Sequence, residues 1–95
     1  LQIYIDFNDR FSQASTLGQL GLLAEEQEDW DQAAVYMVET AAIFAAYQDQ
    51  HSLGIALGTL ARLRAHSPAV VNKLAAALGV TAAEASALLA AADSE

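Results

Sequence analysis

Apolar residues recur at intervals of three and four along most of the chain, which is the spacing of one face of an α-helix. The polar run EEQED at 25–29 interrupts this pattern, and polar residues return at 48–52. The pattern therefore predicts helices over about 12–27, 30–48 and 52–66. The residues expected to face inward in the first two are Leu17, Leu20, Leu23, Ala24, Ala33, Ala34, Met37, Ala41 and Phe44.

The residues at the borders of these segments are of the types that begin and end helices. Asp29 or Asp31 is suited to cap the second helix, because a short side chain there accepts hydrogen bonds from free backbone amides. Ser67-Pro68 restarts the chain after the third helix, with proline suited to a first helical turn. The next apolar face consists of Val70, Val71, Leu74 and Leu78.

The C-terminal part carries one signal for a helix end and one for a new helix. Gly79 suits the left-handed conformation in which many helices end. The run TAAE at 81–84 is a capping box. In this motif the side chains of Thr81 and Glu84 each accept a hydrogen bond from the backbone amide of the other residue. A last helix is expected over about 82–92. These signals predict a helical hairpin at the C-terminus.

The first two thirds of the chain repeat themselves. The stretch FNDRFSQASTLGQLGLLA at 7–24 aligns with YQDQHSLGIALGTLARLR at 47–64, an offset of 40 positions. Repeats of this length are typical of stacked helical units, each of which buries its apolar face against its neighbours. The identical pairs are Asp9 and Asp49, Ser12 and Ser52, Leu17 and Leu57, Gly18 and Gly58, Leu20 and Leu60, and Leu23 and Leu63.

The repetition predicts an all-α fold, an α-solenoid of antiparallel helix pairs with a capping helical hairpin at its C-terminal end. The alignment extends backwards, since Ile3 and Tyr4 match Ile43 and Phe44. The expected organisation has repeats over 1–66, with 1–8 ending the second helix of a preceding unit, 10–48 as one full unit, 50–66 as the first helix of the next, and capping helices over 67–95.

Composition and charge narrow the classes of partner. The chain has a net charge of −8, which disfavours nucleic acids and anionic membranes because both attract lysine and arginine. There is no cysteine, which excludes disulfides and thiolate metal sites. No apolar run reaches the roughly 18–20 residues of a membrane span, and no signal-like leader opens the chain. The expected location is the cytoplasm.

Seven positions follow the order of small and large residues that defines one known repeat. They resemble the tetratricopeptide repeat, a helix–turn–helix module of about 34 residues. The departures are Met37 at a usual aromatic position, Thr40 at a usual alanine, and the longer period. Long units of this kind are similar to arrays in large bacterial, often cyanobacterial, signalling proteins. The matching residues are Leu17, Leu20, Gly21, Ala24, Trp30, Ala33 and Ala41.

The resemblance implies a non-catalytic scaffold that binds a peptide or protein segment in a concave groove lined by the first helix of each unit. Gly18 and Gly58 recur at one repeat position, where they either admit a ligand backbone or allow units to pack closely. The family's clamp for a C-terminal carboxylate is not matched, because Leu22, Gly58 and Thr59 replace its lysine and asparagine. The expected groove residues are Ser15, Gly18, Gln19, Leu22, Ile55, Gly58, Thr59, Arg62 and His66.

Two alternatives to a peptide-binding module remain open. The segment is either a purely structural cap or a module that self-associates through an N-terminal edge formed by Ile3, Tyr4 and Phe7. A remoter alternative is DNA binding by a helix-turn-helix at 72–91. The residues that would contact bases, at 82–86, include no arginine, lysine, asparagine or glutamine, which are the usual direct readers.

The remaining candidate sites favour structural roles. The acidic turn at 25–31 is interpreted as a solvated turn, with contact to a basic partner as the alternative. His51 and His66 are too far apart for a metal pair on one helical face. No nucleophile and base are paired by motif, and no glycine-rich phosphate loop is present. The sequence therefore predicts neither enzymatic activity nor a metal or other cofactor.

Overall fold

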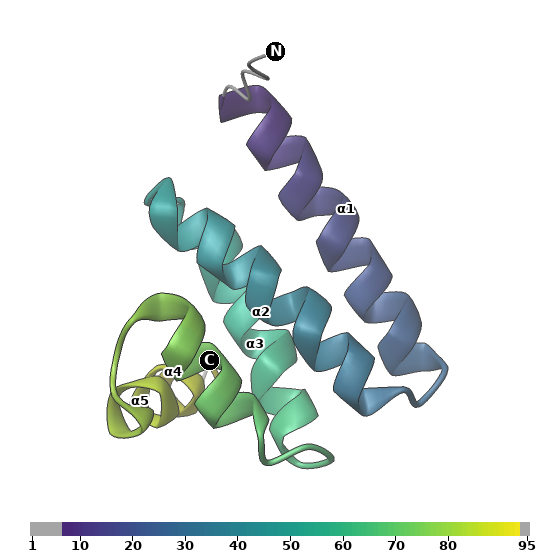
Figure 1. Cartoon of the computed structure of the whole chain (residues 1–95), viewed down its shortest axis with the longest axis vertical. Coiled ribbons are helices and arrows are strands. Elements are labelled where there is room, and N and C mark those ends of the chain that lie inside the picture. The colour runs from purple at the N-terminus through teal and green to yellow at the C-terminus, as the bar shows by residue number, and fades with distance from the viewer. Residues whose placement is uncertain (1–6, 94–95) are drawn as a thin grey trace.

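Five helices follow one another in the computed structural model, which describes the backbone of residues 7–93 and the side chains of residues 12–92. No strand occurs within residues 7–93, so the predicted all-α class is confirmed for that part of the chain. Figure 1 shows α2 lying between α1 and the pair formed by α4 and α5. The helices are α1 (Phe7–Glu26), α2 (Trp30–Ala46), α3 (Gln50–Arg64), α4 (Val70–Leu78) and α5 (Ala82–Asp93).

The α1–α2 and α2–α3 connections have the same geometry. Glu28 and Gln48 each adopt the left-handed conformation, with φ of 62° and 57°. The following aspartates, Asp29 and Asp49, cap α2 and α3 by accepting hydrogen bonds from the backbone amides of Gln32 and Ser52. Of the two candidate caps for α2, Asp29 and Asp31, it is therefore Asp29 that caps the helix. Each turn also closes the preceding helix, since the aspartate amide donates to a carbonyl five residues earlier.

Hydrogen bonding at the start of α3 has a consequence for stability at low pH. The backbone amide of Ser52, with its side chain, holds the pKa of the Asp49 carboxyl below its usual value. A carboxyl whose pKa is lower in the folded state stabilises the fold above its unfolded pKa. That contribution is lost as the pH falls through the lowered pKa. The cap also explains why α3 begins at Gln50, earlier than expected.

Glu28 provides a test of the turn geometry. Left-handed backbone costs a residue with a side chain about 1–2 kcal/mol, and the greater freedom of glycine in the unfolded chain offsets about 0.5–1 kcal/mol of that. We therefore expect Glu28→Gly to raise the free energy of unfolding by roughly 0.5–1 kcal/mol, measured by thermal denaturation. Glu28→Ala is the control, because it removes the charge but keeps the strained φ. An equal gain from both variants would rule out the backbone explanation.

The C-terminal hairpin forms as its local signals predict. Gly79 has φ of 70°, and Thr81 and Glu84 make both capping-box hydrogen bonds at 3.1 Å. Pro68 lies in the turn before α4 instead of inside its first turn, because α4 begins only at Val70. Within the described residues, no single helix is long and apolar enough to cross a membrane; α4 and α5 reach that length only together, with a bend of 109° between them.

The core lies around α3, which is enclosed by α2 on one side and by α4 and α5 on the other. Leu60 and Leu63 are fully buried there. Their counterparts in the first unit, Leu20 and Leu23, are 38% and 49% exposed, so the expectation that these two face inward was wrong. The most deeply buried large side chains are Leu60, Leu63, Leu74, Leu89 and Val70.

The difference arises from the face of α1 on which α2 packs. That face consists of small residues, Ala14, Gly18 and Gly21, and Thr40 and Met37 of α2 lie directly against it. The Thr40 hydroxyl approaches the Ala14 carbonyl to 3.5 Å, and a methyl on Gly21 would lie 2.5 Å from the Met37 sulfur. Close approach of the two backbones therefore replaces leucine packing between α1 and α2.

Candidate functional site

A groove opens between α1 and α3, with α2 as its floor. Its volume is about 280 Å³. The antiparallel turns at Glu28 and Gln48 bring α1 and α3 to the same side of α2, which gives the groove its two walls. The lining residues are Ala14, Ser15, Gly18, Gln19 and Leu22 from α1, Met37, Thr40 and Phe44 from α2, and Ser52, Ile55, Ala56 and Thr59 from α3.

The floor of the groove is apolar and well packed. Met37 and Phe44 of the floor, and Ala14 and Ala56 at the base of the two walls, are all buried in the fold and present only part of their surface to the groove. Small residues dominate on α1, where Gly18 has only Thr40 within ordinary contact distance. The floor is therefore shaped by backbone approach and by two larger α2 side chains.

Hydroxyl groups in the groove divide into two kinds. The Thr40 hydroxyl donates to the Tyr36 carbonyl at 2.9 Å, and the Thr59 hydroxyl donates to the Ile55 carbonyl at 3.4 Å. Their donor capacity is thus used within the fold, mainly toward carbonyls of their own helices, as is common for threonine inside a helix. Donors toward a ligand come instead from Ser15 and Gln19 on the α1 wall, because the Ser52 hydroxyl on the α3 wall is engaged with the Asp49 carboxyl.

The rim carries two large aliphatic side chains that face water. Leu22 of α1 is 47% exposed and Ile55 of α3 is 61% exposed. They stand on opposite walls of one groove. Single exposed aliphatic residues are common on protein surfaces, but a pair that flanks an apolar floor forms one continuous apolar surface. Covering that surface would gain roughly 25 cal/mol for each Å² of apolar area removed from water.

An ion pair bridges α1 and α3 beside the groove. The Arg62 guanidinium donates to both carboxylate oxygens of Glu25, at 3.0 and 3.3 Å. Such two-point pairing fixes the orientation of the guanidinium plane. Arg62 was expected to face the ligand, but it is not among the lining residues and its charge is directed at Glu25.

Six of the nine predicted groove residues line the groove: Ser15, Gly18, Gln19, Leu22, Ile55 and Thr59. The other three, Gly58, Arg62 and His66, do not. His66 instead stacks on Trp30 at the start of α2, with ring centroids 3.9 Å apart and planes within 9°. The prediction missed the whole floor, because the inward-facing residues of α2 have the pattern of core residues and carry no separate signal.

The two repeated glycines differ in their surroundings. Nothing lies within 4 Å of the position that a methyl on Gly58 would occupy. A methyl on Gly18 would make only ordinary contact with Thr40, at 3.7 Å. Packing between described residues therefore requires glycine at neither position. Of the two, only Gly18 lies in the groove, where it leaves room above the floor.

The acidic turn has mainly structural contacts. Asp29 caps α2, Asp31 accepts a hydrogen bond from the Ser67 hydroxyl at 3.2 Å, and Glu25 pairs with Arg62. Glu26 and Glu28 are exposed. The turn is thus tied to the following helix and to the start of the C-terminal hairpin, and it still presents carboxylates to solvent.

The remaining candidates are placed as follows. Ile3, Tyr4 and the side chain of Phe7 lie outside the described residues. The segment at 72–91 forms α4 and α5, and the residues at 82–84 that begin α5 are exposed. Among the described residues, no three histidine, aspartate or glutamate side chains gather in a geometry that would hold a metal ion.

Comparison with known proteins adds no family assignment. No family model matches the chain, and neither the curated proteins nor the solved structures include one that matches it.

Proposed function

We propose that the chain is a non-catalytic interaction module that binds a peptide or protein segment in the groove between α1 and α3. The observation that carries this proposal is the exposed pair Leu22 and Ile55 on opposite walls of an apolar floor. The gain from covering this apolar surface favours a ligand with aliphatic side chains of its own.

The open shape of the groove supports a peptide over a cofactor. Sites for small molecules usually enclose about 300–1,000 Å³ and bury most of the ligand. This groove, with about 280 Å³, is near the lower end of that range and is open to solvent, so it would bury only part of such a ligand. It suits a few side chains of a longer segment whose backbone remains outside. Ser15 and Gln19 then provide hydrogen bonds to that backbone.

We further propose that the helices form part of a tetratricopeptide-like solenoid within a larger bacterial signalling protein of the cytoplasm. The support is the repeat at an offset of 40 positions together with the like turns at Glu28 and Gln48. In such arrays the first helices line the concave surface, which is the role of α1 and α3 in this groove.

The groove assignment is tested by Leu22→Asp. A random peptide library displayed on phage is selected on the purified chain, and an enriched peptide is synthesised and titrated by fluorescence anisotropy. We expect Leu22→Asp to weaken its binding at least about tenfold, because burial of a leucine side chain contributes about 1.5–3 kcal/mol. The variant should keep its helicity by circular dichroism, because the Leu22 side chain is about half exposed.

Leu23→Asp is the matched control for this experiment. Leu23 has nearly the same exposure as Leu22, at 49% and 47%, but does not line the groove. The Leu23→Asp substitution should leave the affinity for the peptide unchanged. Failure to enrich any peptide, or equal loss from the two variants, would refute the groove as the binding site.

A self-associating or structural module is the second candidate. It is favoured by the exposure of Leu20 and Leu23 on α1, whose counterparts Leu60 and Leu63 are covered in the second unit. Light scattering over a dilution series distinguishes the candidates. A mass of two copies that returns to one copy in Leu23→Asp would assign this face to self-association, while the groove remains available.

A further inference from the structure

We infer that the groove selects segments in which an aliphatic side chain is followed closely by a basic one, and that it rejects acidic segments. This inference rests on the proposed function, because it specifies the ligand of the same groove. The distribution of charge around the groove carries the inference. The lining of the groove is uncharged, whereas the end next to the α1–α2 turn is acidic.

The groove itself offers nothing to a charged side chain. Within the described part of the chain, none of the residues that line it carries a charge. A charged group that enters would lose hydration without gaining an ionic partner, which is unfavourable whatever its sign. The side chain on the floor, above Met37 and Ala56, is therefore uncharged and apolar.

One wall of the groove leads directly to a free carboxylate. Ser15, Gln19, Leu22 and Glu26 are spaced by four, three and four residues, so they lie along one face of α1. Leu22 is at the rim, and Glu26 follows one turn later and is exposed. One helical turn advances about 5.4 Å. A basic side chain reaches Glu26 when it stands about two residues from the aliphatic one in an extended segment, or one turn away in a helix.

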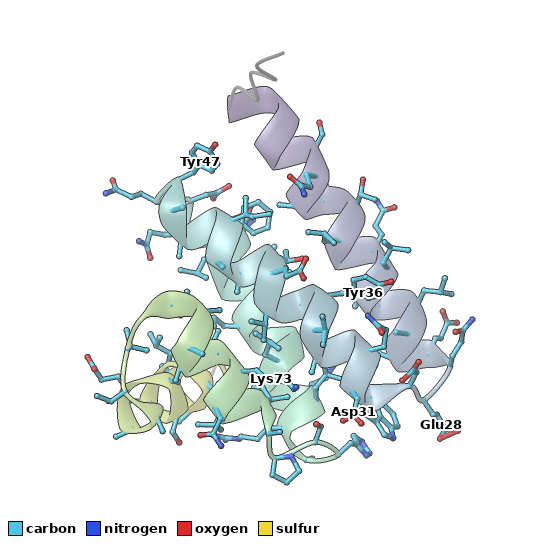
Figure 2. All side chains as sticks on the ribbon, in the orientation of Figure 1. Glu28, Asp31, Tyr36, Tyr47 and Lys73 are labelled. Carbon is cyan, nitrogen blue, oxygen red and sulfur yellow. The ribbon has the colours of Figure 1, made fainter. Side chains whose placement is uncertain are left out.

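The cations of the molecule do not neutralise this end of the groove. Among residues 12–92, the lysine and arginine side chains are those of Arg62, Arg64 and Lys73. Arg62 is occupied by Glu25, and Arg64 donates to the Ser86 hydroxyl on α5. Lys73 lies on α4, away from the turn that carries Glu28 (Figure 2).

The net charge acts in the same direction. Three carboxylates lie at this end of the groove, those of Glu25, Glu26 and Glu28, against one guanidinium, that of Arg62. The whole chain has a net charge of −8. A field of one sign draws ligands of the opposite sign toward the groove and repels acidic ones.

The position of Glu26 also argues against a role in stability. Glu26 is the last residue of α1, and no basic residue occurs in the last turn of that helix. The C-terminal end of a helix carries partial negative charge, so a carboxylate there is unfavourable and a lysine favourable. We therefore expect Glu26→Lys to leave the melting temperature unchanged or higher, while it weakens the binding of a basic ligand.

The test uses the same phage-displayed random library on the full chain and on two charge variants. We expect enriched sequences to combine leucine, isoleucine or methionine with lysine or arginine, and to be depleted in aspartate and glutamate. For a synthesised basic peptide, Glu26→Lys should weaken binding about two- to fivefold, the range of an exposed ion pair. Raising the salt concentration should remove the difference, because salt screens exposed charges.

Glu39→Lys is the control. It makes the same change in net charge on α2, at an exposed position that does not line the groove. Equal weakening by the two variants would overturn the local role of Glu26, as would enrichment of acidic peptides. Aliphatic peptides without a basic bias would refute this inference alone and leave the proposed function intact. A library that yields no binder, or binders insensitive to Leu22→Asp, would refute both.

Discussion

Replacing Leu63 by alanine is expected to lower the free energy of unfolding by about 2–5 kcal/mol, the usual cost of emptying a fully buried leucine site. Leu63 has no exposed surface and lies in the core cluster with residues of α2, α4 and α5. Domains of this size have a total stability of about 5–15 kcal/mol. The variant should therefore lose a large share of its stability and unfold at a much lower urea concentration.

The repeat supplies the control for this experiment. Leu23 is the equivalent residue forty positions earlier, and 49% of its surface is exposed. Leu23→Ala should cost about 1 kcal/mol or less, because much of the side chain is hydrated in the folded state already. Urea unfolding followed by circular dichroism compares the two. Equal losses would contradict the enclosure of α3 between α2 and the C-terminal hairpin.

Gly21→Ala should destabilise the fold by about 1–2 kcal/mol, even though alanine favours helices by about 1 kcal/mol over glycine. The added methyl would lie 2.5 Å from the Met37 sulfur and 2.8 Å from its Cγ. Met37 is itself buried, so admitting the methyl means displacing its packed side chain toward the groove that it lines. The expected fall in Tm is roughly 5–15 °C.

Gly58→Ala separates steric conflict from helix propensity. A methyl at Gly58 meets nothing within 4 Å, so alanine should raise the stability by up to about 1 kcal/mol. The two variants therefore change Tm in opposite directions in one thermal denaturation experiment. A rise in Tm for Gly21→Ala would show that α1 and α2 do not approach as closely as described.

Short-range features of the fold could be predicted from the sequence. An aspartate cap at 29 or 31, which the structure places at Asp29, the left-handed Gly79 and the capping box of Thr81 and Glu84 each depend on residues within a few positions of one another. Their chemistry is therefore visible in any short window of the chain. The end of the helix predicted over 12–27 agrees to one residue, because the Glu28 turn follows directly.

Features that depend on distant partners could not be predicted in the same way. The periodicity of Leu20 and Leu23 identifies a helical face but does not say whether another helix covers it. The pair of Arg62 and Glu25 joins residues 37 positions apart, and no local pattern links them. The wall positions of the groove were expected from the resemblance to a helical repeat whose first helices line a concave surface, and six of those nine positions line the groove.

The packing of α1 has a consequence for how the chain moves. α1 packs mainly on α2, whereas α3 has α2, α4 and α5 as neighbours. Segments held by one interface open more readily than enclosed ones, and their amide hydrogens exchange sooner with solvent. Since α1 forms one wall of the groove, its detachment would abolish the groove. A segment bound to both walls ties α1 to α3, so ligand affinity and the protection of α1 against local unfolding are thermodynamically coupled.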